Sequence, residues 1–205
     1  MSQNRSHAVM AQRSEPNDSL DFFPTPPWAT RALFEHVIGP RHAEVGWDPA
    51  CGDGAMARPM AEYMRSVRSS DVHDYGETPI HDFLQRFTPD WCGRVDWIIT
   101  NPPFRLAEEF VDRGLELAEE GVAILVRSVF IESSGRYERL FRRRPPSVMA
   151  QFVERVAMVK GRLDRKASTA TSYCWLVWEQ RARGEPRLAW IPPCRAALDR
   201  KTDWP

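Results

Sequence analysis

At 205 residues the chain is long enough for one domain with a sizeable core, and its 42% hydrophobic content is typical of a globular protein. No apolar run approaches the roughly 20 residues of a membrane span, and the N-terminus lacks the apolar core of a secretory signal, which predicts a cytoplasmic protein with no membrane partner. The 28 basic and 28 acidic residues cancel, which argues mildly against a dedicated nucleic-acid binder but leaves room for local basic clusters.

The cysteines and histidines indicate neither a metal centre nor a disulfide framework. The four cysteines are scattered without a Cys-x-x-Cys pair, and the five histidines form no His-Glu-x-x-His motif. The sequence therefore predicts a reduced, cytoplasmic protein that uses no metal ion.

An aromatic, proline-rich segment opens the ordered part of the chain. Residues 1–18 are polar and aperiodic and are predicted to be disordered. The sequence Asp-Phe-Phe-Pro-Thr-Pro-Pro at 21–27 predicts a stiff, extended stretch. Thr25 is predicted to cap a helix with Pro26 at its first position, and apolar residues at helical spacing continue this helix to Ile38.

The next segment predicts a strand, a glycine-rich turn and a helix. A strand from Val45 ends at Asp48, the glycines Gly52 and Gly54 follow, and 55–63 is predicted to be helical. This is the first unit of a doubly wound α/β fold, in which glycines let the backbone pass close to a ligand and the helix offers free N–H groups. The Gly-x-Gly spacing is not that of dinucleotide folds or phosphate loops, and the carboxylate at the strand end suits an amine-bearing ligand.

Two acidic positions downstream are candidates for contacts with a nucleoside. Residues 66–72 are predicted to form the second strand, and Asp71 lies 23 residues after Asp48, where a ribose-binding carboxylate sits in such folds. A solvated surface aspartate is the alternative. Asp82 and Phe83 form an acid–aromatic pair that either lines an adenine pocket or begins a short helix.

The most informative stretch is a buried strand that stops at Asn-Pro-Pro-Phe. The apolar run 95–99 predicts a strand of a parallel sheet, and the prolines hold Asn101 in an extended conformation at its end. The Asn101 side chain offers a hydrogen-bond acceptor and Phe104 a π-face, a combination that suits a planar ring with an exocyclic amino group. An ordinary strand that ends at prolines is the alternative.

Helices and strands continue to alternate beyond this tetrapeptide, as expected for an α/β protein. Helices are predicted over 106–117 and 133–141, and strands over 122–126, 148–153 and 173–178. Residues 192–205 show no periodicity and are predicted to be an irregular tail.

Four of these segments, in this order, resemble the S-adenosylmethionine-dependent DNA adenine-N6 methyltransferases. The matching positions are the upstream segment at 22–26, the cofactor loop at 48–54, the ribose acid Asp71 and the catalytic tetrapeptide at 101–104. The segment 172–178, with Arg136 and Arg155 before it, is similar to small phage or prophage members of this family. The resemblance covers about residues 20–180.

The resemblance implies the class I methyltransferase fold, a Rossmann-like, mostly parallel sheet of seven strands whose last strand is antiparallel, with helices on both faces. It implies S-adenosylmethionine as the cofactor and no metal ion. The residues that it assigns to the cofactor are Phe22, Phe23, Thr25, Pro26, Asp48, Pro49, Ala50, Cys51, Gly52, Gly54, Asp71, Val72, Asp82 and Phe83. The residues that it assigns to catalysis are Asn101, Pro102, Pro103 and Phe104.

The chemistry that the resemblance implies depends on positioning and charge. The Asn101 side-chain oxygen and the Pro102 carbonyl would accept hydrogen bonds from the amine and stabilise its developing positive charge. Phe104 would stack on the target base after it has been flipped out of the duplex.

Basic residues are expected beside this site. If the last strand is antiparallel, the connection 155–171 lies at the carboxyl edge of the sheet, where ligands bind in such folds. It carries five basic residues and one acid, a charge that suits contacts with phosphates or simply a solvated loop. The predicted nucleic-acid contacts are Arg127, Arg136, Arg155, Lys160, Arg162, Arg165 and Lys166.

A single methyltransferase domain is predicted over 19–191, without a separate target-recognition domain, because fewer than 30 residues follow Trp178. Sequence selectivity is then expected from short loops or from a protein partner. Asn-Pro-Pro-aromatic also resembles the tetrapeptide of RNA guanine-N2 methyltransferases and of glutamine methyltransferases. The alternatives to DNA adenine methylation are therefore methylation of an RNA base at guanine N2 or adenine N6, protein glutamine methylation, or a non-catalytic cofactor-binding subunit.

Overall fold

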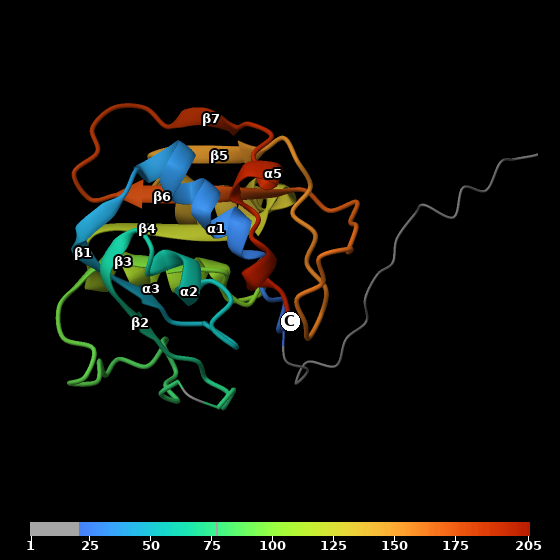
Figure 1. The fold of residues 1–205 in the computed structure, drawn as a ribbon. Coiled ribbons are helices and arrows are strands. Elements are labelled where there is room, and N and C mark those ends of the chain that lie inside the picture. Colours follow the sequence, from blue (N-terminus) through green and yellow to red (C-terminus); the bar gives the residue numbers. More distant parts are fainter. Residues whose placement is uncertain (1–20, 77) are drawn as a thin grey trace, which may run out of the picture.

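A seven-stranded mixed sheet forms the centre of the computed structural model, which describes residues 21–76 and 78–205 (Figure 1). Its strand order is β2-β1-β3-β4-β6-β5-β7. The strands are β1 (Arg41–Asp48), β2 (Met64–Ser69), β3 (Val95–Thr100), β4 (Ala118–Arg127), β5 (Val148–Phe152), β6 (Tyr173–Glu179) and β7 (Arg187–Ile191).

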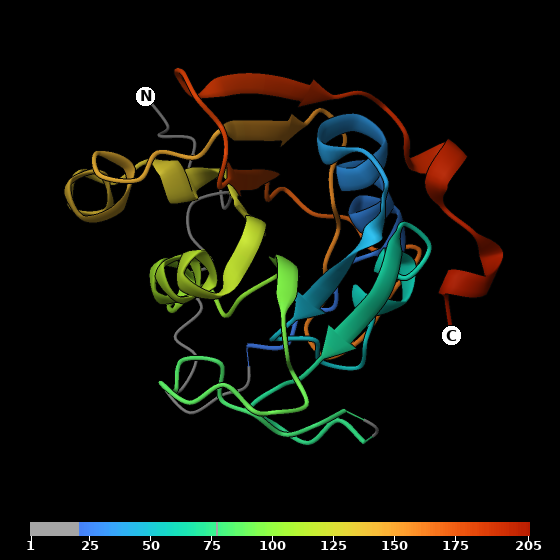
Figure 2. The same cartoon turned by 90° about the vertical axis from the view of Figure 1, so that its left-hand side faces the viewer.

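Helices cover both faces of this sheet, as predicted, with α1 and α3 on opposite sides (Figure 2). The α-helices are α1 (Pro27–Leu33), α2 (Ala57–Met60), α3 (Ala107–Leu117), α4 (Ser134–Arg136) and α5 (Arg195–Leu198). Short π and 3-10 turns are η1 (Phe34–Ile38), η2 (Ser128–Ile131), η3 (Tyr137–Phe141) and η4 (Lys201–Asp203). No helix in the two described ranges is long and apolar enough to cross a membrane.

The central position of β3 explains its mostly apolar sequence, in which the one charged residue, Asp96, accepts the Val45 N–H at 2.7 Å. All six of its residues are buried, and successive side chains point to opposite faces. Trp97 and Ile99 pack into the core under α1, whereas Val95 and Ile98 pack into the core under α3. The strand is therefore covered on both sides, and its carboxyl end delivers Asn101 to the edge of the sheet.

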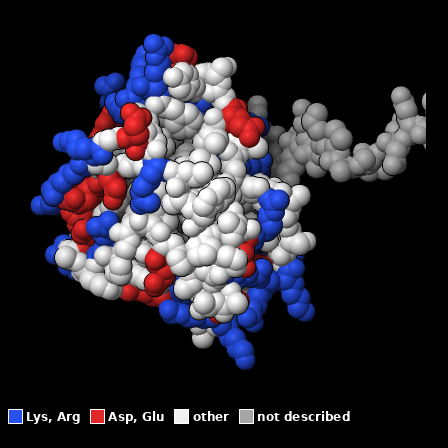
Figure 3. All heavy atoms as spheres, turned by 90° about the horizontal axis from the view of Figure 1, so that it is seen from above, with Lys and Arg blue, Asp and Glu red and all other residues white. Residues whose placement is uncertain are grey.

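The strand predicted to be last, 173–178, is β6, and it is antiparallel as predicted, but one further strand follows it. β6 pairs antiparallel with β4 and β5, and β7 then adds in parallel to the outer side of β5. The sequence reasoning missed β7 because it is a short edge strand between Pro186 and Pro192 whose Leu188 and Trp190 are exposed. Seen from above, this end of the molecule has an uncharged centre with charged side chains around it (Figure 3).

Two predicted helix starts need correction. Pro26, not Thr25, is the N-cap of α1, and Pro27 takes the first helical position, so the helix begins one residue later than predicted. The Thr25 hydroxyl instead donates to the Met158 sulfur. The helix predicted over 55–63 is shorter in the structure, where only α2 is α-helical. The residues from Gly54 to Met56 and those directly after Met60 form turns.

The tail after Pro192 contains more regular structure than predicted. It forms α5 and η4, and Arg31 of α1 holds it through a buried ion pair with Asp203 at 2.6 Å. Arg31 also pairs with Glu62 at 2.8 Å. Paired carboxylates offset the cost of burying this guanidinium, so the tail packs on α1. The segment predicted to be disordered, 1–18, lies outside the described residues.

Candidate active site

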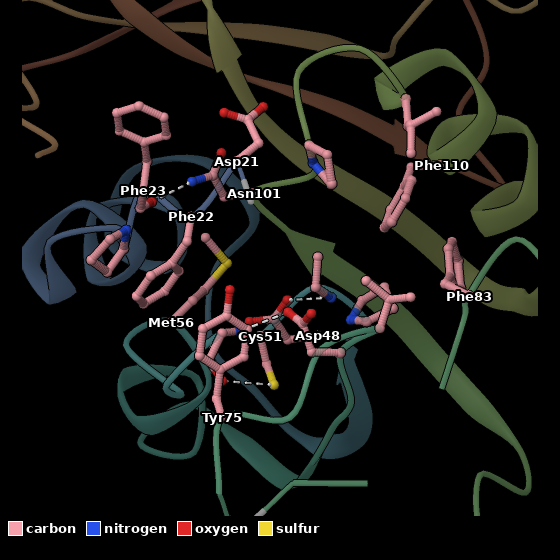
Figure 4. Close-up of a pocket in the computed structure, with 18 of the residues that line it drawn as sticks. Asp21, Phe22, Phe23, Asp48, Cys51, Met56, Tyr75, Phe83, Asn101 and Phe110 are labelled. Atoms are coloured by element: carbon pink, nitrogen blue, oxygen red, sulfur yellow. Dashed lines mark hydrogen bonds between the residues drawn. The ribbon is translucent and has the colours of Figure 1, made fainter. Parts of the chain in front are cut away.

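A cavity of about 270 Å³ opens at the carboxyl ends of β1 and β3 (Figure 4). Five parts of the chain line it: the segment 21–25, the end of β1 with the loop after it, residues between 71 and 84, the end of β3, and the start of α3 with Leu106 and Phe110. The predicted site residues among the lining are Phe22, Phe23, Thr25, Asp48, Pro49, Ala50, Cys51, Gly52, Asp71, Val72, Asp82, Phe83, Asn101 and Pro103.

Four predicted site residues do not line this cavity. Pro26 starts α1, and Gly54 shapes the turn after β1 with φ +81°. Pro102 is buried behind Asn101. Phe104 lies beside the cavity, with its ring centroid 5.9 Å from that of Phe23.

Asp48 at the end of β1 is a carboxylate buried without a cationic partner among the described residues. Its Oδ1 accepts a hydrogen bond from the Thr100 hydroxyl at 2.8 Å and one from the Ala50 N–H at 3.4 Å. Burial raises the pKa of Asp48 to about 7, and the two hydrogen bonds only partly oppose this. A cationic group entering the cavity would therefore favour the ionised form of Asp48.

Asp71 is fixed by the loop that it supports. One carboxylate oxygen accepts the Gly52 N–H at 2.9 Å and the other the His73 N–H at 3.0 Å. Each oxygen keeps a second lone pair for a hydroxyl group of a ligand. Gly52 itself adopts φ +53°, and a Cβ there would lie 2.4 Å from the Phe22 ring, so only glycine fits between the loop and this ring.

The adenine side of the predicted site is more deeply buried than expected. Phe83 is 2% exposed and packs edge-on against Trp47, with ring centroids 5.2 Å apart. Asp82 caps the following turn, since its Oδ1 accepts the Leu84 N–H at 3.0 Å. Both residues reach the cavity, and Val72 beside them is exposed.

The amide of Asn101 has a defined direction. Its Nδ2 donates to the Phe23 carbonyl at 2.9 Å and to the Met158 sulfur at 3.7 Å (Figure 4). Rotating the amide by 180° would place its oxygen against these two acceptors, so the observed orientation is the favourable one. The oxygen Oδ1 is buried and has no hydrogen-bond partner among the described residues. A buried acceptor without a donor is costly, which marks Oδ1 as a ligand position.

Several solved structures share the fold of this chain. The modification subunit of a protein described as a type I restriction enzyme from Vibrio vulnificus YJ016 matches with TM-score 0.59 and 18% identity, over 90% of this chain and 50% of that one. The methyltransferase subunit of a type I restriction-modification system from Streptococcus thermophilus matches with TM-score 0.54 and 11% identity, over 80% and 45%. A protein described as an RNA methyltransferase from Pyrococcus horikoshii gives 0.53 and 14%, over 73% and 80%. The fold is that of the class I methyltransferases.

These likenesses extend to the fold alone, because the sequences have diverged widely. The chain spans about half the length of the two restriction-modification subunits. No protein-family model and no curated protein matches the sequence. The described residues also contain no group of three or more His, Cys, Asp or Glu side chains that could hold a metal ion.

In this methyltransferase fold the connection 155–171 lies at the cavity edge, as predicted from the antiparallel strand. The Gly161 N–H donates to the Phe22 carbonyl at 2.9 Å, and Met158 contacts Asn101. Its positive charge is smaller than predicted, because Arg165 pairs with Asp199, which lies outside the connection.

The other predicted nucleic-acid contacts differ in the interactions that they already make within the protein. Arg136 is committed to the fold, since it pairs with Glu108 and donates to the Phe130 carbonyl. Arg155 donates to the Ser172 hydroxyl, Lys166 is exposed, and Lys160 is partly buried. Arg127 is placed differently: its guanidinium lies over the Phe104 ring, 4.3 Å from the centroid. It therefore contacts the last residue of the tetrapeptide 101–104.

Three residues of the site escaped the sequence reasoning. Asp21 lines the cavity and accepts the Phe104 N–H at 2.8 Å. Tyr75 also lines the cavity and packs on Phe22 with ring centroids 4.7 Å apart. Met158 orients Asn101. The position of Asp21 beside the aromatic segment was a usable signal, whereas Tyr75 and Met158 reach the site through tertiary packing alone.

Proposed function

We propose that this protein transfers the methyl group of S-adenosylmethionine to the exocyclic N6 amino group of adenine in DNA. The observation that carries the proposal is the buried, unpartnered Oδ1 of Asn101 at the cavity. The lone pair of an aromatic amine delocalises into its ring, so the nitrogen is a poor nucleophile. An acceptor that draws on the N–H groups favours the tetrahedral, more nucleophilic form and stabilises the positive charge of the transition state.

The remainder of the cavity suits the methyl donor. The cofactor would supply an electrophilic methyl group on a sulfonium. Asp48, with its pKa raised to about 7 by burial, would attract the cofactor's ammonium group, and Asp71 would accept the ribose hydroxyls. The Gly52 turn lets the backbone approach the cofactor, and Phe22 covers it.

The reaction follows from positioning. The N6 amine would donate to Asn101 Oδ1 and to the Pro102 carbonyl, with the methyl group in line behind the nitrogen. Phe104 would stack on the base, and Arg127, now over that ring, would contact the DNA backbone. Reaching an adenine inside a duplex requires base flipping.

Adenine in DNA is preferred over the other amines on sequence grounds. The proline-rich segment at 22–26 and the Asp-Pro-Ala start of the loop at 48–50 separate this chain from the guanine-N2 and glutamine methyltransferases that share the tetrapeptide. RNA methylation is the second candidate, supported by the fold match to the P. horikoshii protein.

The test offers one labelled cofactor to matched polymers. The purified protein is incubated with methyl-labelled S-adenosylmethionine and a DNA duplex, the single strand, an RNA of the same sequence, or a protein extract. The nucleosides and amino acids are then identified by mass spectrometry. We expect N6-methyladenine from DNA and no label in DNA whose adenines are replaced by 2-aminopurine, which lacks the N6 amine. Label confined to RNA or to protein would refute the assignment to DNA.

Asn101→Ala separates catalysis from cofactor binding. Removing one stabilising acceptor typically costs about 100- to 1000-fold in rate. We expect a rate loss of this size at saturating cofactor, with cofactor affinity by calorimetry within a few-fold of wild type. A variant that loses cofactor binding as well would show that Asn101 has a different role.

A further inference from the structure

We propose that Asp21 accepts the proton that the amine loses on methylation, an inference that rests on the function proposed above. Asp21 lines the cavity beside Asn101, and Figure 4 shows both side chains at its mouth. Its Oδ2 accepts the Phe104 N–H at 2.8 Å, which fixes the carboxylate three residues from the amine acceptor. Within the described chain Oδ1 receives no hydrogen bond, and Asp21 forms no ion pair.

The proton balance of the reaction requires such a group. The amine nitrogen forms a bond to the methyl carbon while the carbon–sulfur bond breaks, and the electron pair of that bond stays on sulfur. The nitrogen then carries one proton too many and a positive charge. The amide oxygen of Asn101 stabilises this charge but is too weak a base to remove the proton. A carboxylate at the same edge can take it and later release it to water, because Asp21 is only half-buried.

The two oxygens of Asp21 therefore have different tasks. Oδ2 holds the backbone of the tetrapeptide at Phe104, and Oδ1 would take the proton from the amine. Its negative charge also lies near the place where positive charge develops, which lowers the barrier before any proton moves. The same charge repels a phosphate backbone, so its presence at the mouth of a nucleic-acid site favours a role in the chemistry over one in polymer binding.

Two substitutions separate the two tasks. Asp21→Asn keeps an oxygen that can accept the Phe104 N–H but removes the charge and the basicity, whereas Asp21→Ala removes all three. Asp90→Asn, at an exposed position, is the matched control for loss of one negative charge. Methyl transfer is followed in a single turnover at saturating cofactor and DNA, and cofactor and DNA affinities are measured separately by calorimetry and by anisotropy.

We expect Asp21→Asn to slow the single turnover by about 100-fold, the typical contribution of a general base, with cofactor affinity unchanged and DNA affinity equal or higher. Asp90→Asn is expected to react at the wild-type rate. Full activity of Asp21→Asn, or a rate loss in Asp21→Ala alone, would overturn the inference and leave Asp21 as a support for Phe104. A wild-type protein that methylates no amine would refute the proposed function instead, so the two failures are distinguishable.

Discussion

Asp48 is predicted to destabilise the free protein at neutral and higher pH. Its carboxyl group is 1% exposed, and burial raises its pKa from 3.8 to about 7. The folded state therefore binds the Asp48 proton more tightly than the unfolded state does. The stability that the neutral form provides is complete below about pH 4 and is lost as the pH rises through 7.

The size of this loss follows from the two pKa values. The interval from 3.8 to about 7 corresponds to about 4 kcal/mol of folding free energy once Asp48 is ionised. Asp48→Asn removes the charge and keeps the shape. Both the Thr100 hydroxyl and the Ala50 N–H donate to Oδ1, which an asparagine retains. We expect the substitution to raise the free energy of unfolding at pH 8 by up to about 4 kcal/mol and at pH 5 by no more than about 2 kcal/mol, because the unfolded carboxyl already ionises above pH 3.8.

Urea unfolding of both proteins at pH 5 and pH 8 measures this difference, and subtracting wild type from variant cancels the other titrating groups. Asp90→Asn, an exposed control, is expected to show the same difference at both values. The reasoning would be refuted if Asp48→Asn lowered the free energy of unfolding by the same amount at pH 5 and at pH 8.

The cofactor should reverse this penalty, because its ammonium group favours the ionised form of Asp48. Cofactor affinity of the wild-type protein is then expected to fall by up to about tenfold per pH unit below pH 7. The affinity of Asp48→Asn is expected to be weak and independent of pH in that range. Calorimetry in buffers of different ionisation enthalpy would detect the proton released on binding.

Three further substitutions test the packing around the site and the fold. Gly52→Ala would place a Cβ 2.4 Å from the Phe22 ring and is expected to lower cofactor affinity at least about tenfold by calorimetry, since the ring must move. Gly121→Ala would place a Cβ 2.6 Å from the Trp97 ring and should cost about 3 kcal/mol in urea unfolding. Arg31→Met leaves the buried Asp203 carboxylate without its cation, while Glu62 keeps Arg200, and should cost about 3 kcal/mol in the same assay.

A matched control separates the effect at Gly52 from general strain. Gly184→Ala, the control for Gly52→Ala, also has a positive φ, +103°, but its Cβ would meet open space, so cofactor affinity should stay unchanged. Gly121 has no positive φ, so its expected loss comes from the contact with Trp97 without backbone strain. If a test substitution and its control had equal effects, the loss would come from backbone strain and not from the contact of the new Cβ with the aromatic ring.

The sequence predicted the parts of the structure whose causes are local. The apolar run of β3 and the prolines after it place Asn101, and the glycines after β1 place Asp48 at the cavity. Each of these features depends on residues within about ten positions of one another. The seven-stranded sheet was implied by the resemblance to a methyltransferase family, and the structure has seven strands with β6 antiparallel.

The features that the sequence did not predict depend on partners far along the chain. β7 is a strand only because β5 offers it an edge, and its own side chains are mostly exposed. The basic residues look free in sequence, yet Arg165 finds Asp199 and Arg136 finds Glu108, 34 and 28 residues away. A count of charges along a segment thus overestimates the charge that its surface presents.

The direction of the Asn101 amide shows how far the site depends on such partners. The Phe23 carbonyl and the Met158 sulfur hold its Nδ2, and a hydrogen bond from the Gly161 N–H to the Phe22 carbonyl ties the two supporting segments together. Phe22 also packs over the Gly52 turn where the cofactor is proposed to bind. The same short segment therefore borders the proposed cofactor site on one side and orients the amine acceptor on the other. A change that moves Phe22 is expected to turn Asn101 as well.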